Sequence, residues 1–556
     1  MKKSKSGVPT FQMLQPRQAA SKSGNILRIN PTVNAPNNSK SVTIICSESD
    51  NNKFSIVYDD GFYLSGDGLA EGIVLSDGFN AMNLAQLEVK YNRPDIVLER
   101  LGAPKETVAE AKRLRERLAR RSDFKNLEGA SLIDVPLVTL PSDLPTTSAE
   151  KVFQMRYSAT NNSGNLKYLL VYNNGALVST MPLLGPEGKP GFDSSGTLNL
   201  HLISGLNKIQ LCAVNEDGVP SNFAEKSVTC TAPPVSKTAY IVSCGVSEYQ
   251  DANYNLRYAA KDAGDVAEAF SKSANARGLT PKILCLKNSE VDANAVIKIR
   301  EFLADATVDD EVTLFFAGHG MLDKDLNYHY ARHDTNFQAT ENIGIQFDEL
   351  ESLVDNIKPL KRTVLFDTCH SGEVEEESKD AVRAMVAGQA APPAEAANVQ
   401  STKIATRGMK VTAVAPKVSH SELIDLEKLF PDSRRAKGAN ILTSSSGSEF
   451  SMESPEWKNG LFTYSLLKSL NDPLADSDKN GNLTFSEVAE NVKNKVSMLS
   501  SGKQRPITRG VNREQDPILV SFNPPKTESP APQAPPAPST PGEKKDEKKS
   551  WWSFGS

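Results

Sequence analysis

From Lys237 to about Phe522 the chain alternates short apolar runs with amphipathic stretches, and this alternation restricts the fold more than any other feature of the sequence. A run that is apolar throughout predicts a strand buried on both faces of a sheet, and amphipathic helices between such strands are typical of parallel crossovers. We therefore expect an α/β domain over residues 237–522, with a mostly parallel sheet flanked by helices. The apolar runs are TAYIVSCGV, PKILCL, EVTLFFAG and RTVLFD.

Two of these runs end in residues that can carry out chemistry. EVTLFFAG is followed by His319, which stands between Gly318 and Gly320, and RTVLFD is followed by Thr368 and Cys369. The carboxyl ends of parallel strands meet at one edge of a sheet, and active groups collect there. We therefore predict that the imidazole and the thiol lie close together at this edge.

A thiol beside an imidazole predicts nucleophilic attack on a carbonyl group. His319 would take the proton of the Cys369 thiol and then protonate the leaving amine. The backbone N–H groups of Gly320 and Cys369 would hold the developing oxyanion. His370 is a competing base, but neighbouring residues of an extended segment point to opposite sides, so it should face away from the thiol. His329 follows in a polar stretch and is predicted to lie on the surface.

The segments FFAGHGM and LFDTCHSGE resemble the paired histidine and cysteine motifs of caspase-like cysteine peptidases, and most closely those of the metacaspase and bacterial orthocaspase branch. That branch has serine where this chain has Thr368. The 50 residues from His319 to Cys369 also match the caspase pattern, so the spacing belongs to the resemblance and is not an independent result. The resemblance covers about residues 237–522. It implies a caspase-like fold and a cysteine endopeptidase made as a zymogen.

Two carboxylates refine the prediction of the substrate. Asp367 stands two residues before Cys369, so its side chain points to the same side of the strand end, and Asp262 lies in the helix after the first strand. The resemblance implies that both line the pocket for the residue before the scissile bond, where animal caspases carry arginine. Two carboxylates favour a cation, so we predict cleavage after Arg or Lys. Otherwise Asp262 is a solvated helix residue, and Asp367 caps a neighbouring turn.

Residues 373–438 interrupt the alternation and are rich in Ala, Pro and Thr, which predicts a long exposed loop. Such a loop inside a compact domain is uncommon and tends to be functional. In the family that this chain resembles, the link between the large and small parts is often cut during maturation. We therefore expect self-cleavage near Lys403–Lys410 or Arg434–Arg435, with an unprocessed surface loop as the alternative.

The remaining chain divides by composition. Residues 1–40 are rich in Lys, Ser, Asn and Pro and are predicted to be disordered, and residues 41–127 are predicted to form a small α+β segment. Strand-like pieces between turns predict an Ig-like β-sandwich over residues 148–232, a module that mediates contacts or acts as a spacer. Residues 523–556 form a Pro-rich tail that ends in aromatic residues, suited to a partner's pocket, to a membrane interface or to a disordered end.

The stretch DSDKNGNLTFSE has the spacing of a calcium-binding loop. Oxygen ligands at alternating positions, a glycine at the sixth and a glutamate at the twelfth are what the ion requires. The alternative is a series of Asp/Asn turns, with Ser486 capping the next helix. The candidate ligands are Asp476, Asp478, Asn480, Asn482 through its carbonyl, and Glu487.

Composition excludes several other classes. The net charge of −5 does not suggest a nucleic-acid partner, and six cysteines without a CxxC pair disfavour both a zinc site and a disulfide scaffold. No run of 18 apolar residues occurs, so a cytoplasmic location is expected. The predicted chemistry requires no cofactor, and the expected partners are a protein or peptide substrate and a regulator bound by the sandwich or the tail. The alternative function is a non-catalytic regulatory or scaffold protein with a caspase-like fold.

Overall fold

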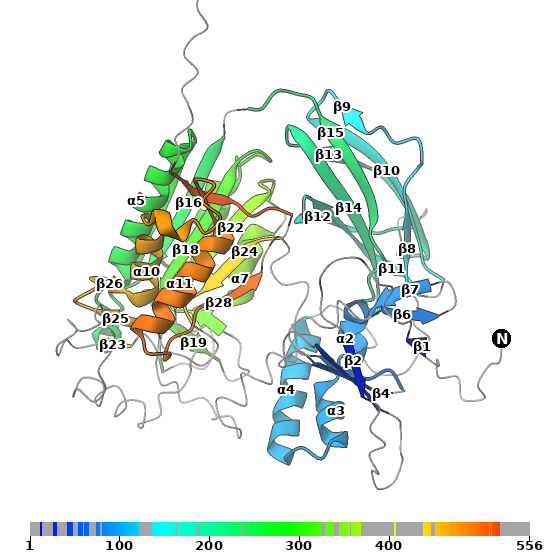
Figure 1. The fold of residues 1–556 in the computed structure, drawn as a ribbon, viewed down its shortest axis with the longest axis horizontal. Coiled ribbons are helices and arrows are strands. Elements are labelled where there is room, and N and C mark those ends of the chain that lie inside the picture. Colours follow the sequence, from blue (N-terminus) through cyan, green and yellow to red (C-terminus); the bar gives the residue numbers. More distant parts are fainter. Residues whose placement is uncertain are drawn as a thin grey trace, which may run out of the picture.

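The structure is a computed structural model, and three regions of the chain are well described: an N-terminal α+β part, a β-sandwich and a C-terminal α/β domain (Figure 1). The loop with Cys369 and His370 lies outside the described residues except at 405–406, and so does the tail from residue 523. The described residues are 12–13, 26–29, 42–47, 54–58, 60–65, 74–77, 80–121, 135–162, 164–185, 189–235, 237–323, 328–338, 344–355, 357–368, 405–406, 438–445, 451–510, 512 and 514–522.

The C-terminal domain is built on a six-stranded sheet, and the four apolar runs named above form four of its strands. Its first five strands are parallel and the last, at the edge, is antiparallel. The predicted α/β class is therefore confirmed. In spatial order the strands are β17 (Thr280–Lys287), β16 (Thr238–Gly245), β18 (Glu311–Gly318), β22 (Lys361–Thr368), β24 (Asn440–Thr443) and β28 (Ile507–Gly510).

Helices cover both faces of this sheet (Figure 1). One face packs on α5 (Ala259–Ala276), α10 (Leu461–Leu470) and α11 (Phe485–Leu499). The other packs on α6 (Ala295–Leu303), α7 (Phe347–Glu351) and the 3₁₀ turn η4 (Ser352–Val354). The central strand β18 is buried along its whole length, which explains its uninterrupted apolar sequence.

Several short elements complete the domain. Two three-stranded sheets and one pair of strands lie outside the main sheet. Three 3₁₀ turns connect helices and strands. The strands are β19 (Gly320–Leu322), β20 (Tyr328–Tyr330) and β21 (Ile345–Gln346); β23 (Ala405–Thr406), β25 (Met452–Ser454) and β26 (Asn459–Gly460); and β27 (Asn482–Thr484) with β29 (Ile518–Ser521). The turns are η2 (Ala252–Tyr254), η3 (Asn288–Glu290) and η5 (Pro473–Ala475).

Before this domain lies a sandwich of two sheets with a common apolar core. Its strands alternate buried and exposed side chains where one face meets the core, as in β10. One sheet contains β13 (Asp193–His201), β10 (Val152–Thr160) and β8 (Leu137–Thr139). The other contains β12 (Ala176–Pro182), β11 (Leu166–Asn173), β14 (Gly205–Asn215), β15 (Ala224–Cys230) and β9 (Thr147–Ser148).

The N-terminal part combines two small sheets with helices. Two of its strands, β1 (Gln12–Met13) and β2 (Ile26–Ile29), lie within residues 1–40, and β2 pairs with β3. The expectation of disorder for the rest of this segment falls outside the described residues. The other elements are β3 (Val42–Ser47), β4 (Phe54–Tyr58), β5 (Tyr63–Ser65), β6 (Val74–Asp77), β7 (Asn80–Asn83), η1 (Leu84–Leu87), α2 (Glu88–Tyr91), α3 (Pro94–Arg100) and α4 (Lys105–Arg121).

Glu311, the first residue of β18, joins three elements of the C-terminal domain. Its carboxylate accepts hydrogen bonds from Arg277, which caps α5, at 2.7 Å and from Lys361 of β22 at 2.9 Å. Burial raises the pKa of this carboxyl, but the two cations outweigh burial and hold the pKa below its usual range. The ion pairs should therefore stabilise the fold above the ordinary glutamate pKa of about 4.3. This stabilisation is lost as the pH falls through the lower, folded-state pKa.

We expect Glu311→Gln to lower the free energy of unfolding at pH 7 by about 1.5–3 kcal/mol, the usual contribution of hydrogen bonds to charged groups. The difference from the unsubstituted protein should shrink as the pH is lowered below about 4, because the native carboxylate is then protonated as well. Urea unfolding at several pH values measures both effects. Equal stability of the two proteins at pH 7 would contradict the expectation.

Candidate active site

The central strands β18 and β22 end side by side. They pair in parallel, and the last pair in register is Gly318 with Thr368. His319 is the next residue after β18, and Cys369 is the next residue in the sequence after β22. Cys369 lies outside the described residues, so its distance from the imidazole stays a prediction, as does the orientation of His370.

His319 is held from several sides by aromatic residues. Its side chain is buried, and its backbone N–H donates to the Tyr249 hydroxyl at 3.0 Å. The imidazole packs against the Tyr249 ring, with centroids 5.1 Å apart, and against the edge of Phe337 at 5.9 Å. Its Nε2 lies 2.8 Å from the carbonyl oxygen of Tyr254. A carbonyl only accepts hydrogen bonds, so Nε2 carries the proton in the neutral ring and Nδ1 carries the lone pair.

The glycines on either side of His319 have different roles. Gly318 has φ of +149°, which favours glycine, and a Cβ there would lie 3.1 Å from the Tyr249 hydroxyl and 3.2 Å from the Tyr330 ring. Gly320 is buried and begins β19, where it pairs with Tyr330 of β20. The aromatic residues thus pack against the backbone on both sides of the histidine, which fixes its position at the sheet edge.

Strand β20 links the histidine segment to the end of β22. The hydroxyl of Tyr328 donates to Thr368 Oγ1 at 2.6 Å, and both residues are buried. The next residue, His329, is also buried and contacts Asp323 at 3.1 Å through Nε2. The prediction that His329 lies on the surface is therefore wrong. Its polar neighbours in the sequence resemble a loop, but the tyrosines on either side bring the strand into the core.

Replacing Tyr328 by Phe should lower kcat on a peptide substrate about fivefold to tenfold and change KM little. It removes one hydrogen bond, worth about 1 kcal/mol, that positions the residue before Cys369 and keeps the aromatic ring. Tyr330→Phe is the matched control, because the Tyr330 hydroxyl donates to the carbonyl of Ala317, which belongs to the histidine strand β18. Steady-state kinetics of both variants tests the link. Similar losses in both would show that hydroxyl groups in β20 matter only for the fold.

Asp367 of β22 and Asp262 of α5 both contact the residues at the start of α10. Asp367 is fully buried and accepts hydrogen bonds from Ser451 Oγ at 2.8 Å and from the Thr463 hydroxyl at 2.6 Å and backbone N–H at 3.3 Å. Asp262, also fully buried, accepts from the side chain of Asn459 at 2.8 Å. The backbone N–H of residue 460 donates to it as well.

These contacts bear on the structural alternatives named for the two aspartates. Asp262 is not a solvated helix residue, because it faces the core. Asp367 does cap a neighbouring element, since it accepts from the first turn of α10, where unpaired N–H groups favour a negative charge. Both carboxylates therefore have a structural role at the start of α10. If they also select the substrate, they must do so while keeping these hydrogen bonds.

A third buried carboxylate belongs to the same region. Glu453 of β25 is 1% exposed and accepts a hydrogen bond from the backbone N–H of Arg257, just before α5, at 2.9 Å. Its short strand pairs with β26, which contains Asn459, the residue that donates to Asp262. Nothing in the local sequence MES marks Glu453 as functional, because its position depends on contacts almost 200 residues apart.

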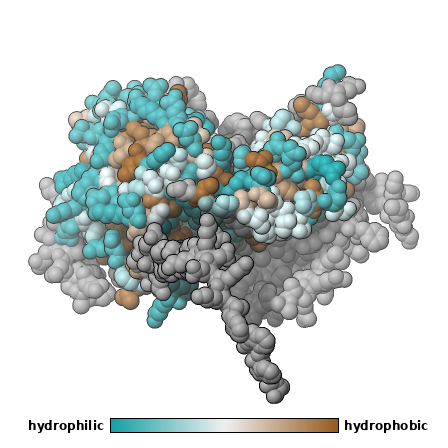
Figure 2. Space-filling model, turned by 90° about the horizontal axis from the view of Figure 1, so that it is seen from above, coloured by the Kyte–Doolittle hydropathy of each residue, from teal (hydrophilic) through white to brown (hydrophobic). Residues whose placement is uncertain are grey.

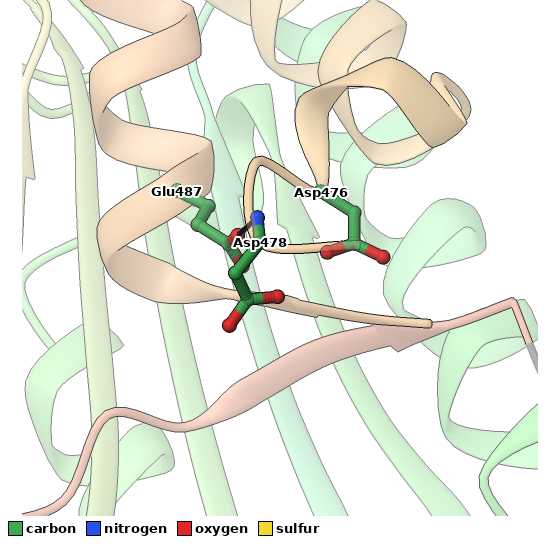
Figure 3. Close-up of side chains that lie close together, drawn as sticks. All are labelled: Asp476, Asp478 and Glu487. Atoms are coloured by element: carbon green, nitrogen blue, oxygen red, sulfur yellow. Dashed lines mark hydrogen bonds between the residues drawn. The ribbon is translucent and has the colours of Figure 1, made fainter. Parts of the chain in front are cut away.

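The predicted calcium loop brings its carboxylates together (Figure 3). One oxygen from each of Asp476, Asp478 and Glu487 lies within 4.8 Å of the others. Asp476 accepts from the backbone N–H of Gly481 at 2.7 Å, and Gly481 has φ of +84°, as the sharp turn requires. Asn482 begins β27, where it pairs with β29.

The helix after this loop is capped differently from the prediction. Thr484, not Ser486, is the N-cap of α11, and the Glu487 carboxylate bonds back to it in a capping box. The other oxygen of Glu487 accepts from the backbone N–H of Ser477 at 2.8 Å. Ser486 instead donates its backbone N–H to Asp516. Glu487 can thus serve the helix and still lie beside the other carboxylates.

A helix-covered parallel sheet with a buried histidine at the carboxyl edge of its central strand defines a caspase-like α/β domain. The chain belongs to the caspase family of cysteine peptidases, since the family model described as Caspase domain matches residues 237–518. No curated protein matches the chain. Within the described residues, no helix has the length and apolar character needed to cross a membrane.

Solved structures show a distant likeness only. A Geobacter sulfurreducens protein is 17% identical, with 52% of this chain and 98% of that chain covered and a TM-score of 0.32. Caspase-1 from Spodoptera frugiperda is 11% identical, with 51% and 90% covered and a TM-score of 0.30. Fibronectin(III)-like modules from Clostridium thermocellum are 10% identical, with 17% and 98% covered and a TM-score of 0.13.

Proposed function

We propose that the protein is a cysteine endopeptidase that cleaves peptide bonds after Arg or Lys, with Cys369 as nucleophile and His319 as base and acid. The observation that carries the proposal is the register of β18 and β22, whose last pair, Gly318 with Thr368, directly precedes these two residues. The family match supports a cysteine peptidase in general.

The geometry of His319 suits the proposed reaction. With Nε2–H directed at the Tyr254 carbonyl, the Nδ1 lone pair takes the thiol proton as the Cys369 sulfur attacks the substrate carbonyl. The N–H groups of Gly320 and Cys369 stabilise the resulting oxyanion. Nδ1–H then protonates the leaving amine, and the acyl-enzyme forms as the peptide C–N bond breaks. In the second half, His319 takes a proton from water, whose oxygen attacks the thioester carbonyl. The C–S bond then breaks, the carboxylic acid product leaves, and the proton passes from His319 to the Cys369 sulfur.

Selection of a basic residue is assigned to Asp262 and Asp367. The assignment is supported by the complete burial of both carboxylates on one side of the sheet, near its carboxyl edge. A substrate guanidinium or ammonium would be attracted there. Glu453 adds a third buried carboxylate to this region. Amide and hydroxyl groups of residues 451–463 donate to both aspartates and hold the two carboxylates in place at the start of α10.

Self-processing is part of the proposal. The segment between Thr368 and Gly438 connects two neighbouring strands of the sheet, β22 and β24, and contains many Lys and Arg residues that fit the proposed specificity. Cleavage near Lys403–Lys410 or Arg434–Arg435 would leave both strands paired. Mass spectrometry of the purified protein identifies such sites, and a Cys369→Ala protein that still fragments when purified alone would exclude self-cleavage.

A panel of short fluorogenic peptides ending in Arg, Lys or Asp tests the proposed function directly. The protein should cleave the Arg and Lys peptides, and the Cys369→Ala variant should cleave none. Cleavage after Asp alone would overturn the assignment of Asp262 and Asp367. The absence of any cleavage by the protein, whole or cut in the 373–438 loop, would favour a non-catalytic regulatory role.

We also propose that residues 476–487 bind a calcium ion, supported by the twelve-residue spacing and by the three convergent carboxylates (Figure 3). Such loops bind calcium with a Kd between about 10⁻⁹ and 10⁻³ M. Calorimetric titration should detect binding in this range, and Asp478→Asn should weaken it about tenfold or more. The matched control is Asp472→Asn. Asp472 lies just before the loop and caps η5, so this variant should bind calcium normally. No heat of binding at millimolar calcium would exclude the site.

A further inference from the structure

The β-sandwich contacts the catalytic domain through a hairpin turn at residues 173–176, which joins β11 to β12. Figure 1 shows the sandwich beside the main sheet, and Figure 2, from above, shows the two as adjoining masses with hydrophobic residues scattered among hydrophilic ones. Asn174 and Gly175 both have positive φ, at +46° and +75°, as a tight two-residue turn requires. We call residues 173–176 the hairpin turn.

The sandwich is fixed first to the part of the catalytic domain that precedes residues 369–437, the chain between β22 and Gly438, which we call the 369–437 loop. Ala176 is fully buried in a small apolar cluster with Val308, which precedes β18, and Leu360, which precedes β22. Nearby, Lys151 of the sandwich forms an ion pair with the buried Asp309 at 3.0 Å. These contacts lie at the amino ends of the strands, at the opposite edge of the sheet from His319.

The same hairpin turn also contacts the part that follows the loop. The backbone of Gly438 lies so close to residues 175 and 176 that a Cβ on Gly438, which has φ of +85°, would overlap the Gly175 carbonyl. A Cβ on Gly175 would overlap Asn512 Oδ1, and Asn512 Nδ2 donates to the Asn174 carbonyl at 3.1 Å in a buried hydrogen bond. Beside them, Lys208 of β14 pairs with Glu514 at 2.8 Å.

One turn therefore spans the boundary between the two parts of the catalytic domain. Gly438 precedes β24 and Asn512 follows β28. The hairpin turn therefore contacts the chain next to both strands that come after the loop. These segments share no covalent link with the sandwich other than through the 369–437 loop. Contacts of this kind are retained when the loop is cut, because all of the groups involved lie outside it.

We propose that the hairpin turn is a docking surface for the C-terminal part of this chain, residues 438–522, and holds it in place once the loop is cut. This inference rests on the proposed function in one respect only, namely that the protein itself cuts the loop. The docking contact does not depend on which protease makes the cut. The sandwich would then be a structural component of the mature peptidase rather than a spacer.

The experiment uses the full chain with Cys369→Ala, which silences its own peptidase, and a recognition sequence for another protease inserted between residues 373 and 437. After cutting, size-exclusion chromatography in increasing urea measures when the two pieces separate. Gly175→Ala should raise the dissociation constant of the pieces at a fixed urea concentration by about tenfold or more, equivalent to about 1.4 kcal/mol. The uncut chain should change less, because the loop keeps the pieces at high effective concentration.

The matched control is Gly205→Ala. Gly205 lies in the same sandwich and also has positive φ, +93°, but a Cβ there would meet nothing within 4 Å. Both variants therefore carry backbone strain, and only Gly175→Ala disturbs the contact. Equal retention of the pieces in the two variants would overturn the proposal. If Gly175→Ala does not fold, Gly438→Ala against Gly278→Ala repeats the comparison from the catalytic side, since Gly278 has φ of +74° and open space.

Discussion

Replacement of His319 by Gln is expected to lower kcat/KM for an Arg-ended peptide by about 10²- to 10⁴-fold, the usual contribution of a positioned general base and acid. Glutamine keeps the size and polarity of the side chain, and its amide can still donate to the Tyr254 carbonyl. It cannot take a proton from the Cys369 thiol or return one to the leaving amine. Initial rates with saturating and limiting peptide measure the loss.

His333→Gln is the control for this experiment. His333 also places a ring nitrogen on a backbone carbonyl, since its Nδ1 lies 2.6 Å from the oxygen of Glu248. His333 therefore makes the same kind of contact as His319 but does not lie at the end of β18. The kcat/KM of the His333→Gln variant should stay within about twofold of that of the unsubstituted protein. The unfolding transition of each variant separates a loss of chemistry from a loss of fold.

A residual rate within tenfold of the unsubstituted protein would contradict the proposed dyad. Such a result would mean that another base serves Cys369, or that the thiol is not the nucleophile. The adjacent His370 is the first alternative, and His370→Gln in the same assay decides it. A loss in both variants of equal size would point to a shared structural cause.

The strands at the centre of the domain could be predicted because burial on both faces leaves a clear pattern. EVTLFFAG and RTVLFD are apolar throughout, and both are central strands of the observed sheet. The apolar spacing of FDELESLVDNI predicts one helix, but only Phe347–Glu351 is α-helical and Ser352–Val354 is a 3₁₀ turn. The apolar spacing marks which side faces the core, and it does not determine how tightly the backbone winds.

Side-chain partners far apart in the sequence could not be predicted. The contact of Asp262 with Asn459 joins residues 197 positions apart, and no local pattern indicates it. The burial of Glu453 and the approach of Gly438 to Gly175 have the same origin, since each depends on how complete elements pack. The burial of His329 could not be predicted either, because its partner, Asp323, stands in a stretch whose composition is that of a loop.

Asp367→Asn should selectively weaken cleavage after Arg. If its charge meets the substrate guanidinium, its loss should cost about 2–5 kcal/mol of transition-state binding. This corresponds to a decrease in kcat/KM of roughly 30-fold or more. Asparagine fits the site, because its Oδ1 can accept from Thr463 while its Nδ2 donates to the Ser451 hydroxyl. Asp262→Asn is less suitable, because both of its oxygens accept from N–H groups and an amide would leave a donor facing a donor.

The structural role of Asp367 at α10 must be separated from substrate selection. A peptide that ends in citrulline, the uncharged analogue of arginine with nearly the same shape, makes this possible. Loss of the helix cap costs up to about 2 kcal/mol of stability at a buried position and should affect both peptides alike. Loss of a charge partner affects only the arginine peptide. The ratio of kcat/KM for the two peptides therefore measures the electrostatic contribution alone.

Asp310→Asn provides a matched control for the ratio. Asp310 is a buried aspartate that accepts from the backbone N–H groups of Thr307 and Thr238 at the opposite edge of the sheet. Its substitution should lower stability and leave the arginine-to-citrulline ratio unchanged. An Asp367→Asn protein with the same unchanged ratio would assign this carboxylate to α10 alone, and the choice of substrate would then fall to Asp262, Glu453 or residues outside the described part of the chain.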